Sequence, residues 1–338
     1  MPIGGTHMRS PPEPKIIQKL VDVYPSFALL AGMQLDLFTP LKAGPMRPEQ
    51  IADAIGVEVT KLKPLLYALV AAELLTVKGD RFANTVEANH FLVRGSPAYM
   101  GGVHPLYADL WDAALQTAES IRTGQPQAKH DYTQMPREAL ETFYQGLHPG
   151  ALTTGRTLVK DYGLSSCQRL LDVGGGSGGV AIAVAKASPH IQATVVDVSN
   201  VTPITQHFVA EAGVSDRVKV ITGNIVEAPI HGSFDAVVLK SFIQVLSPSD
   251  AQHALKNINA TIAPGGTIYI LGIGILDNSR ISPRGAAITN TIFINIYDEG
   301  QAYTEAEYQD WITAAGFVNF KRDTLPDGLG IITAQKPM

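Results

Sequence analysis

The sequence predicts an α/β fold in which a mostly helical N-terminal region precedes a mixed, mainly parallel β-sheet covered by helices. Three observations predict it: helical periodicity before residue 165, β-branched runs alternating with helical ones after it, and a glycine-rich turn directly after the first such run. At about 150 residues per domain, the 338 residues suffice for two domains.

The composition excludes several classes of protein. Hydrophobic residues make up 45% of the chain and charged residues only 17%, which excludes a disordered chain. A net charge of −5 gives no basic field for nucleic acid or anionic membranes. Cys167 is the single cysteine, so an internal disulfide is excluded. We find no signal peptide and no apolar run near the roughly 18 residues of a membrane span, and we expect a soluble, cytoplasmic protein.

The N-terminal region contains a helix–turn–helix followed by a hairpin. Apolar spacings of three and four predict helices over Lys15–Val23, Phe27–Phe38, Pro48–Ile55, Val59–Leu74 and Tyr107–Arg122. Two short strands around Gly79-Asp80 follow the fourth of these helices, which makes the motif a winged helix. It serves either DNA binding or packing and dimerisation. The second helix offers only Lys61 and Lys63 to a groove, so we favour dimerisation.

The C-terminal region alternates strands with helices, which predicts βαβ units and a parallel sheet. The predicted strands are Arg169–Val173, Gln192–Val198, Val218–Thr222, Ala236–Lys240 and Thr267–Leu271. The final pair, Phe317–Arg322 and Gly330–Gln335, has no helix between its members and predicts an antiparallel hairpin at one edge.

The glycine-rich turn Gly174-Gly-Gly-Ser-Gly-Gly179 fits two cofactor patterns. One is the dinucleotide pattern, in which a pyrophosphate lies over a helix N-terminus. The other begins at Asp172, whose carboxylate suits the cationic amino group of S-adenosylmethionine and suits a pyrophosphate poorly. Asp197 lies 23 residues past Gly174, where an acid meets ribose hydroxyls in either case.

Further runs give the chain its resemblance to a family. They are Leu171-Asp-Val-Gly-Gly-Gly-Ser-Gly178, Asp216-Arg-Val with Gly223-Asn-Ile225, Leu239-Lys-Ser-Phe-Ile-Gln-Val-Leu-Ser247, Pro264-Gly-Gly266, Tyr303-Thr-Glu-Ala-Glu307 and Ala315-Gly-Phe317. Together they make the chain resemble, over nearly its whole length, the small-molecule O-methyltransferases of plants and bacteria, which include caffeate and acetylserotonin O-methyltransferases. The resemblance implies a Rossmann-like seven-stranded methyltransferase domain preceded by a winged-helix dimerisation domain. It also implies S-adenosylmethionine as cofactor, a small-molecule substrate and a homodimer.

On this resemblance we expect four regions. They are residues 1–14 as a disordered start or cloning remnant, 15–100 as the winged-helix dimerisation domain, 101–164 as a helical linker and substrate cap, and 165–338 as the S-adenosylmethionine-binding domain.

The resemblance also assigns cofactor-binding residues. They are Asp172, Gly174, Gly175, Gly176, Gly178, Asp197, Val198, Asn224, Ile225 and Lys240. Asn224 stands where the family usually has an aspartate facing the adenine, and its amide oxygen can accept the same hydrogen bond. Lys240 occupies the basic position after the fourth strand.

The chain departs from the family at the catalytic base. Gln244 stands where the family has a histidine that deprotonates a phenol, and an amide cannot take that proton. The acids that orient this histidine are absent as well, since Gly272 and Gln301-Ala-Tyr303 stand in their places. Three interpretations remain: an acceptor that needs no deprotonation, a replacement base, or a homologue that binds the cofactor without transferring the methyl group.

We favour the first interpretation, with Gln244 in the catalytic position. A thioether sulfur has no proton to lose, and methyl transfer to it requires only alignment and desolvation. Family members that S-methylate 4-methylthio-2-hydroxybutyrate, in dimethylsulfoniopropionate biosynthesis, would fit such a site. His148 is the candidate replacement base if the acceptor is a hydroxyl.

The resemblance implies that substrate contacts come from the helices before the cofactor domain and from the insert after the fifth strand, in addition to Gln244 after the fourth strand. The candidate residues are Tyr107, Trp111, Tyr144, His148, Gln244, Arg284, Asn290 and Tyr297, with His104 and Arg280 as further candidates. The scattered histidines form no metal-binding pair, so we expect no metal. The rival functions are a nicotinamide-dependent oxidoreductase and a winged-helix regulator that senses S-adenosylmethionine.

Overall fold

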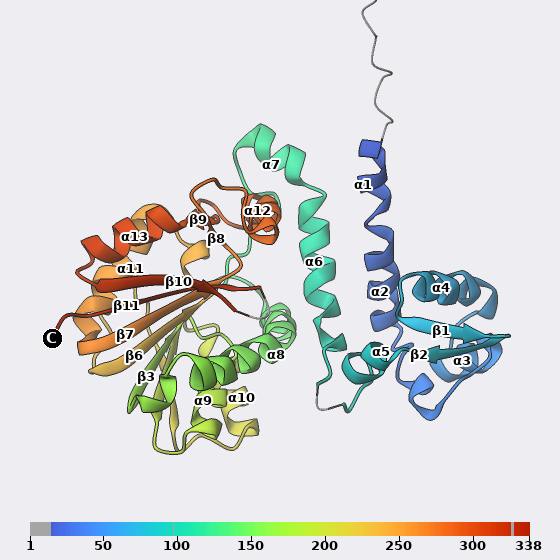
Figure 1. Ribbon diagram of the computed structural model, residues 1–338, viewed down its shortest axis with the longest axis horizontal. Helices are drawn as coiled ribbons and strands as arrows, with labels where there is room; N and C mark the ends of the chain where they lie inside the picture. Colours follow the sequence, from blue (N-terminus) through green and yellow to red (C-terminus); the bar gives the residue numbers. More distant parts are fainter. Residues whose placement is uncertain (1–14, 97, 326–327) are drawn as a thin grey trace, which may run out of the picture. The chain divides into compact units, whose positions relative to one another are not determined.

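The computed structural model describes residues 15–96, 98–325 and 328–338, so the predicted start over residues 1–14 lies outside the described residues. The chain divides into two compact units, with the boundary between His104 and Pro105 (Figure 1). The extent of the predicted substrate cap, residues 101–164, stays a prediction.

The first unit has the predicted order of helix, turn, helix and hairpin. Its elements are η1 (Lys15–Ile17), α1 (Gln18–Val21), α2 (Tyr24–Gln34), η2 (Pro40–Ala43), α3 (Pro48–Ile55), α4 (Val59–Ala71), β1 (Leu75–Lys78), β2 (Arg81–Asn84), α5 (Val86–Phe91) and η3 (Gly101–Val103). Gly56 ends α3 in the left-handed conformation, at φ 69°. Strands β1 and β2 pair antiparallel, with Lys78 opposite Arg81 across the turn. Lys63 forms an ion pair with Glu49 at 2.9 Å, so this lysine of α4 is already neutralised.

The first helical segment carries large apolar side chains on its surface. Ile16, Ile17, Leu20 and Phe27 are all exposed. Taken as one run, Lys15–Gln34 spans 20 residues and is long and apolar enough, by length and composition, to cross a membrane. The sequence prediction that no run approaches this length was therefore wrong. Core helices of soluble proteins and signal sequences meet the same criterion, so one such helix is weak evidence for a membrane span.

The second unit is built on a seven-stranded sheet of order β10-β11-β7-β6-β3-β4-β5. The strands are β3 (Arg169–Val173), β4 (Gln192–Asp197), β5 (Val218–Thr222), β6 (Phe234–Lys240), β7 (Ile262–Gly272), β10 (Val318–Thr324) and β11 (Gly330–Gln335). Strands β3 to β7 pair parallel, whereas β10 and β11 form the predicted antiparallel hairpin at one edge. A separate two-stranded pair joins β8 (Ile275–Leu276) to β9 (Tyr303–Thr304).

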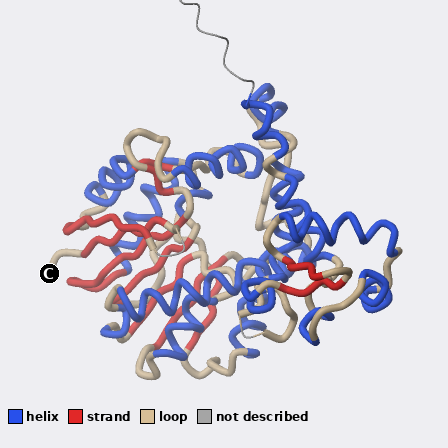
Figure 2. The backbone as a smooth tube through the Cα atoms, turned by 45° about the vertical axis from the view of Figure 1, so that its right-hand side comes forward, coloured by secondary structure: helices blue, strands red, loops and turns tan. Residues whose placement is uncertain are grey.

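Helices cover both faces of this sheet (Figures 1 and 2). The helices that pack on it are α8 (Arg137–Asp161), α9 (Gly179–Ala187), α10 (Thr202–Glu211), α11 (Pro248–Thr261) and α13 (Glu305–Ala314). Helices α6 (His104–Ala114) and α12 (Arg284–Ile296) pack in a separate cluster, α7 (Thr117–Thr123) contacts α12, and the short turns are η4 (Leu164–Ser166) and η5 (Ile243–Val245). One core packs α8 and α9 against the sheet, and the other packs α11 and α13 against its opposite face. The sheet and these helices thus form three layers within the second unit, with the strands in the middle.

Chain order fixes where a ligand can bind on this sheet. The chain runs outward from β3 to β4 and β5 on one side, and from β6 to β7 on the other. The gap between the carboxyl ends of β3 and β6 is the switch point at which open α/β sheets bind ligands.

Candidate active site

The turn after β3 requires glycine because other parts of the chain approach it closely. Gly174, Gly176 and Gly178 have φ values of +59°, +56° and +69°, which disfavour side chains. A Cβ atom at Gly174 would lie 2.4 Å from Phe242, and one at Gly176 would lie 2.4 Å from the ring of Tyr144. The rings of Phe242 and Tyr144 therefore leave no room for side chains on this glycine turn at the switch point.

Asp172, at the end of β3, carries a buried oxygen with no partner. The residue is 1% exposed, and its Oδ2 accepts one hydrogen bond, from the Ala181 N–H at 3.3 Å. No described residue bonds to Oδ1. Burial raises the pKa of Asp172 to about 7, with Asp197 adding to the rise and the Lys240 charge opposing it. An unpartnered acidic oxygen at this place favours a cationic donor and disfavours a pyrophosphate.

Asp197, at the end of β4, holds the glycine turn in place by hydrogen bonding. Its Oδ2 accepts the Gly176 N–H and its Oδ1 accepts the Val198 N–H, both at 2.8 Å. Burial raises the pKa of Asp197 to about 6, although these two hydrogen bonds oppose the rise. Just beyond Val198, a cavity of about 230 Å³ is lined by Met135, Arg137, Leu140, Ser199, Asn200 and Pro203.

Two of the predicted cofactor-binding residues, Asn224 and Ile225, lie on the turn after β5. Asn224 is exposed, and its side chain bonds to the Val226 N–H and to Glu227 within its own turn. Ile225 is buried in the core on the α11 face, and its carbonyl accepts a hydrogen bond from Asn257 at 2.8 Å. The cofactor contacts of both residues stay predictions.

Gln244 is buried at the carboxyl end of β6, and glycines make room for it. Its Oε1 accepts the Gly274 N–H at 3.3 Å. A Cβ atom at Gly272 would lie 2.6 Å from this Oε1, and one at Gly274 would lie 3.2 Å from the Gln244 side chain. The side-chain amide of Gln244 thus fills the space that side chains at Gly272 and Gly274 would need.

Four aromatic side chains connect Gln244 to the glycine turn. They are Tyr132, Phe143, Tyr144 and Tyr297, called the aromatic cluster below. Phe143 lies 5.6 Å from Tyr132 and 5.3 Å from Tyr144 between ring centroids. Desolvation raises the pKa of the Tyr297 phenol, and hydrogen bonds with Tyr132 and Gln244 oppose that rise. Tyr132 and Phe143 were not predicted, because only the folded chain brings the loop before α8 beside Tyr297.

His148 lies against the glycine turn. Its Nδ1 is 2.9 Å from the Ser177 hydroxyl, and its ring stacks on Phe208 with centroids 4.3 Å apart. Burial lowers the pKa of His148, with Glu211 and Lys186 acting in opposite directions. One ring nitrogen is thus engaged by the cofactor turn, and the base role stays a prediction.

The remaining substrate candidates have other surroundings. Tyr107 and Trp111 face each other on α6, with centroids 6.3 Å apart. The amide oxygen of Asn290 accepts the Ala302 N–H at 2.8 Å, Arg280 pairs with Glu307 at 2.9 Å, and Arg284 is exposed at the start of α12. His104 belongs to the first unit. Substrate contacts for all of these stay predictions.

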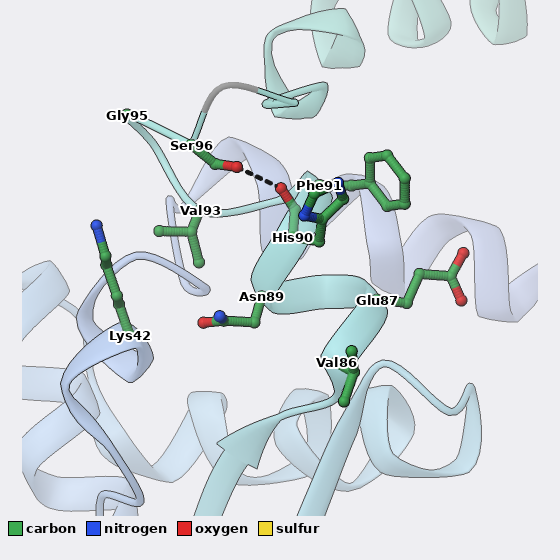
Figure 3. A pocket seen from close by; sticks show the side chains of 9 residues that line it. All are labelled: Lys42, Val86, Glu87, Asn89, His90, Phe91, Val93, Gly95 and Ser96. Carbon is green, nitrogen blue, oxygen red and sulfur yellow. Dashed lines mark hydrogen bonds between the residues drawn. The ribbon is translucent and has the colours of Figure 1, made fainter.

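A cavity of about 670 Å³ lies in the first unit (Figure 3). It is lined by Lys42, Val86, Glu87, Asn89, His90, Phe91, Val93, Gly95 and Ser96. The Ser96 hydroxyl donates to the His90 carbonyl at 2.6 Å, and the Lys42 and Glu87 side chains point away from each other. None of the predicted site residues lines it, so it is not the predicted site. Among the described residues, no group of three or more His, Cys, Asp or Glu side chains is arranged to hold a metal.

Two family models match the chain. An O-methyltransferase domain matches residues 110–318, more than half of the chain. An O-methyltransferase dimerisation domain matches residues 19–94.

Individual relatives are similar over almost the whole length. The 3-hydroxy-5-methyl-1-naphthoate 3-O-methyltransferase of Streptomyces sahachiroi is 29% identical over 91% of each chain. The 8-amino-8-demethylriboflavin N,N-dimethyltransferase of Streptomyces davaonensis is 26% identical over 90% of this chain and 89% of its own. The structure of human N-acetylserotonin methyltransferase, in complex with S-adenosylmethionine, shares the fold with a TM-score of 0.82 and 22% identity, over 98% of this chain and all of its own.

Proposed function

The chain belongs to the O-methyltransferase family, and from this premise we propose that its methyl acceptor is a thioether sulfur, such as that of 4-methylthio-2-hydroxybutyrate. The protein is an S-adenosylmethionine-dependent methyltransferase of small molecules. The observation that carries the proposal is the burial of the Gln244 amide, which cannot take a proton, at the position where the sequence resemblance places the family's histidine base.

The residues of the second unit fit S-adenosylmethionine. The glycine turn leaves no room for side chains, and the Oδ1 atom of Asp172 is a buried acceptor with no described partner. In this proposal Asp172 binds the amino group of the methionine portion, Asp197 binds the ribose, and Asn224, Ile225 and Val198 surround the adenine. Lys240, whose charge acts on Asp172, stands at the edge of the same site.

The protein groups near Gln244 position the acceptor and exclude water. When bound, the cofactor would supply a methyl group on a sulfonium, with the C–S electron pair leaving on its sulfur. A thioether acceptor would take this methyl group with a sulfur lone pair and would have no proton to lose. The aromatic cluster and Gln244 present a surface without a carboxylate to this reaction, and alignment with desolvation supplies the acceleration. Residues 101–164 act as the cap over the acceptor.

A panel of unlabelled acceptors with methyl-labelled S-adenosylmethionine tests the proposal. We expect label in the sulfonium product of a thioether. Label in phenols and in no thioether would overturn it.

A hydroxyl acceptor is the second candidate. The Streptomyces sahachiroi relative is named for transfer to oxygen, and the His148 imidazole is close to the cofactor turn. A phenol with a pKa of about 10 is mostly protonated near neutral pH, so this reaction needs a base. The bond to Ser177 leaves only Nε2 of His148 for that role.

We also propose that the protein acts as a homodimer in the cytoplasm. The dimerisation-domain match covers the helices whose apolar side chains are exposed, including Leu20 and Phe27. A second copy would cover these side chains, which a soluble monomer would leave in water. The single, buried cysteine is consistent with a reducing compartment.

A further inference from the structure

His130, in the loop between α7 and α8, is a buried histidine held at one nitrogen. Its Nε2 lies 2.9 Å from Oδ2 of Asp109, a residue of α6 whose side chain is 56% exposed. The His130 side chain is only 5% exposed. Its other nitrogen, Nδ1, is buried and has no partner among the described residues.

The contact with Asp109 determines what Nδ1 can do. A carboxylate only accepts hydrogen bonds, so Nε2 carries the proton. In the neutral imidazole, Nδ1 then carries no proton, and its lone pair can accept a hydrogen bond. A buried acceptor without a donor is unfavourable, which makes it a ready partner for an incoming ligand.

The surroundings of His130 place it at the aromatic cluster. Its ring lies 6.3 Å from that of Tyr132 and 5.7 Å from that of Phe143, edge to face in both cases. Its backbone N–H donates to the Ile296 carbonyl at 2.8 Å, one residue before Tyr297. His130 therefore lies beside the side chains that connect Gln244 to the glycine turn.

We propose that Nδ1 of His130 accepts a hydrogen bond from a hydroxyl group of the methyl acceptor, which makes His130 a specificity-determining residue. The inference rests on the proposed function only in placing the acceptor beside the aromatic cluster, and it does not depend on which atom is methylated. Asp109 is a positioning residue that fixes the proton on Nε2.

The test compares two ligands that differ by one hydroxyl, 4-methylthio-2-hydroxybutyrate and 4-methylthiobutyrate. Their affinities are measured by calorimetric titration into the full chain saturated with S-adenosylhomocysteine, and their kcat/KM values with S-adenosylmethionine. We expect the wild-type protein to prefer the hydroxylated ligand by at least about tenfold, because a buried acceptor is left unpaired by the other ligand.

Substitutions then assign the preference to His130. His130→Phe keeps a planar ring without the lone pair, and we expect it to bind both ligands equally. His130→Gln retains an acceptor and should keep part of the preference, which covers the case in which the phenylalanine variant folds poorly. His253→Gln, at an exposed histidine, is the matched control and should behave as wild type. The inference is overturned if both His130 variants lose affinity for the two ligands equally, or if their preference for the hydroxylated ligand is unchanged.

Asp109 needs a readout that a merely structural role would not move. The ¹⁵N resonances of His130 report which nitrogen carries the proton. We expect Asp109→Ala to shift His130 from the Nε2-protonated form toward a mixture of the two tautomers and to lose part of the ligand preference, and Asp109→Asn to restore both. An unchanged tautomer in Asp109→Ala would contradict the positioning role.

The inference and the proposed function fail separately. If neither thioether binds or is methylated, the thioether proposal fails. The same comparison is then made with 1-naphthol and naphthalene as ligands of the S-adenosylhomocysteine complex. A preference for the hydroxyl that His130→Phe abolishes would still support the inference, and its absence would overturn it.

Discussion

The amide of Gln244 occupies the space that a side chain at residue 272 would need, since a Cβ atom on Gly272 would lie 2.6 Å from Oε1 of Gln244. Residues 244 and 272 are the positions at which the sequence resemblance places the family's histidine base and one of the acids that orient it. Because the Gln244 amide lies where a side chain at residue 272 would begin, substitutions at the two positions should affect each other.

This coupling predicts the effect of enlarging Gly272. We expect Gly272→Ala to lower the free energy of unfolding by about 1 kcal/mol, the low end of the cost of overpacking, because the clashing atom is the end of the Gln244 side chain. The loss should shrink in the Gln244→Ala background, and a double-mutant cycle of thermal or urea unfolding measures this coupling. Gly285→Ala is the control, because a Cβ atom at that helical glycine meets nothing within 4 Å. Additive effects at residues 244 and 272 would contradict the coupling.

The glycine turn predicts a loss of cofactor binding in Gly176→Ala. The new Cβ atom would lie 2.4 Å from the Tyr144 ring, in a backbone conformation with φ +56° that disfavours alanine. We expect the Kd for S-adenosylhomocysteine, measured by calorimetry, to rise by at least about tenfold. Gly213→Ala has the same type of strain, at φ +68°, with nothing within 4 Å. It should lose stability without losing affinity, and an equal loss of affinity in both variants would contradict this role of Gly176.

Replacing the Asp172 carboxyl should raise the stability of the ligand-free protein above neutral pH and lower its affinity for the cofactor. Its pKa is raised from 3.8 to about 7, so the native carboxyl binds its proton more strongly than the unfolded one. The ligand-free protein should therefore lose stability as the pH rises from about 4 to about 7, and level off above that. Asp172→Asn removes this contribution, although Asp197, with a pKa raised to about 6, still contributes in the same direction.

The measurement is thermal unfolding across this pH range, with and without S-adenosylmethionine. At about pH 8 we expect ligand-free Asp172→Asn to melt above the wild type and to bind the cofactor at least about 100-fold more weakly. Asp310→Asn, at an exposed carboxylate, should change neither quantity. A ligand-free Asp172→Asn protein that melts below the wild type at that pH would contradict the prediction.

The first helical segment has an exposed apolar face, which we expect to form the dimer interface. One charged residue placed on this face should therefore disrupt the dimer. Leu20 is 69% exposed and lies within the matched dimerisation region. We expect Leu20→Asp to shift the mass measured by light scattering from dimer to monomer, because an interface buries such a side chain. Leu115→Asp, at an 80% exposed leucine of the second unit, is the matched control and should leave the mass unchanged. A Leu20→Asp protein that remains dimeric would contradict this interface.

Local sequence signals predicted the scaffold well. The strands Arg169–Val173, Val218–Thr222 and Gly330–Gln335 and the helix Pro48–Ile55 are confirmed at their predicted bounds, since turn residues delimit each one. The predicted helix Tyr107–Arg122 was wrong in its continuity, because it is broken into α6 and α7 at residues 115–116. The Thr117 hydroxyl donates to the Ala114 carbonyl at that break, a local bond that competes with the helix.

The site was predictable where one motif builds it and not where distant segments meet. Asp172, the glycines and Asp197 follow from consecutive strand ends, and the structure brings them together. The pair of His130 with Asp109, and the contacts of Tyr132 with Tyr297, join loops and helices that no spacing rule connects. The link between Gly272 and Gln244 likewise appears only when the ends of β6 and β7 lie side by side.

The pH dependence of kcat with saturating 4-methylthio-2-hydroxybutyrate tests transfer without proton removal most directly. Saturation matters, because kcat reports the bound complex, whereas kcat/KM also reports Asp172 of the free enzyme. We expect kcat to stay constant within about twofold from about pH 6 to about pH 9, and His148→Phe to lower it by less than about tenfold. The contradicting result is a kcat that rises with pH in the wild type and no longer does so in His148→Phe. It would show that His148 removes a proton from the acceptor.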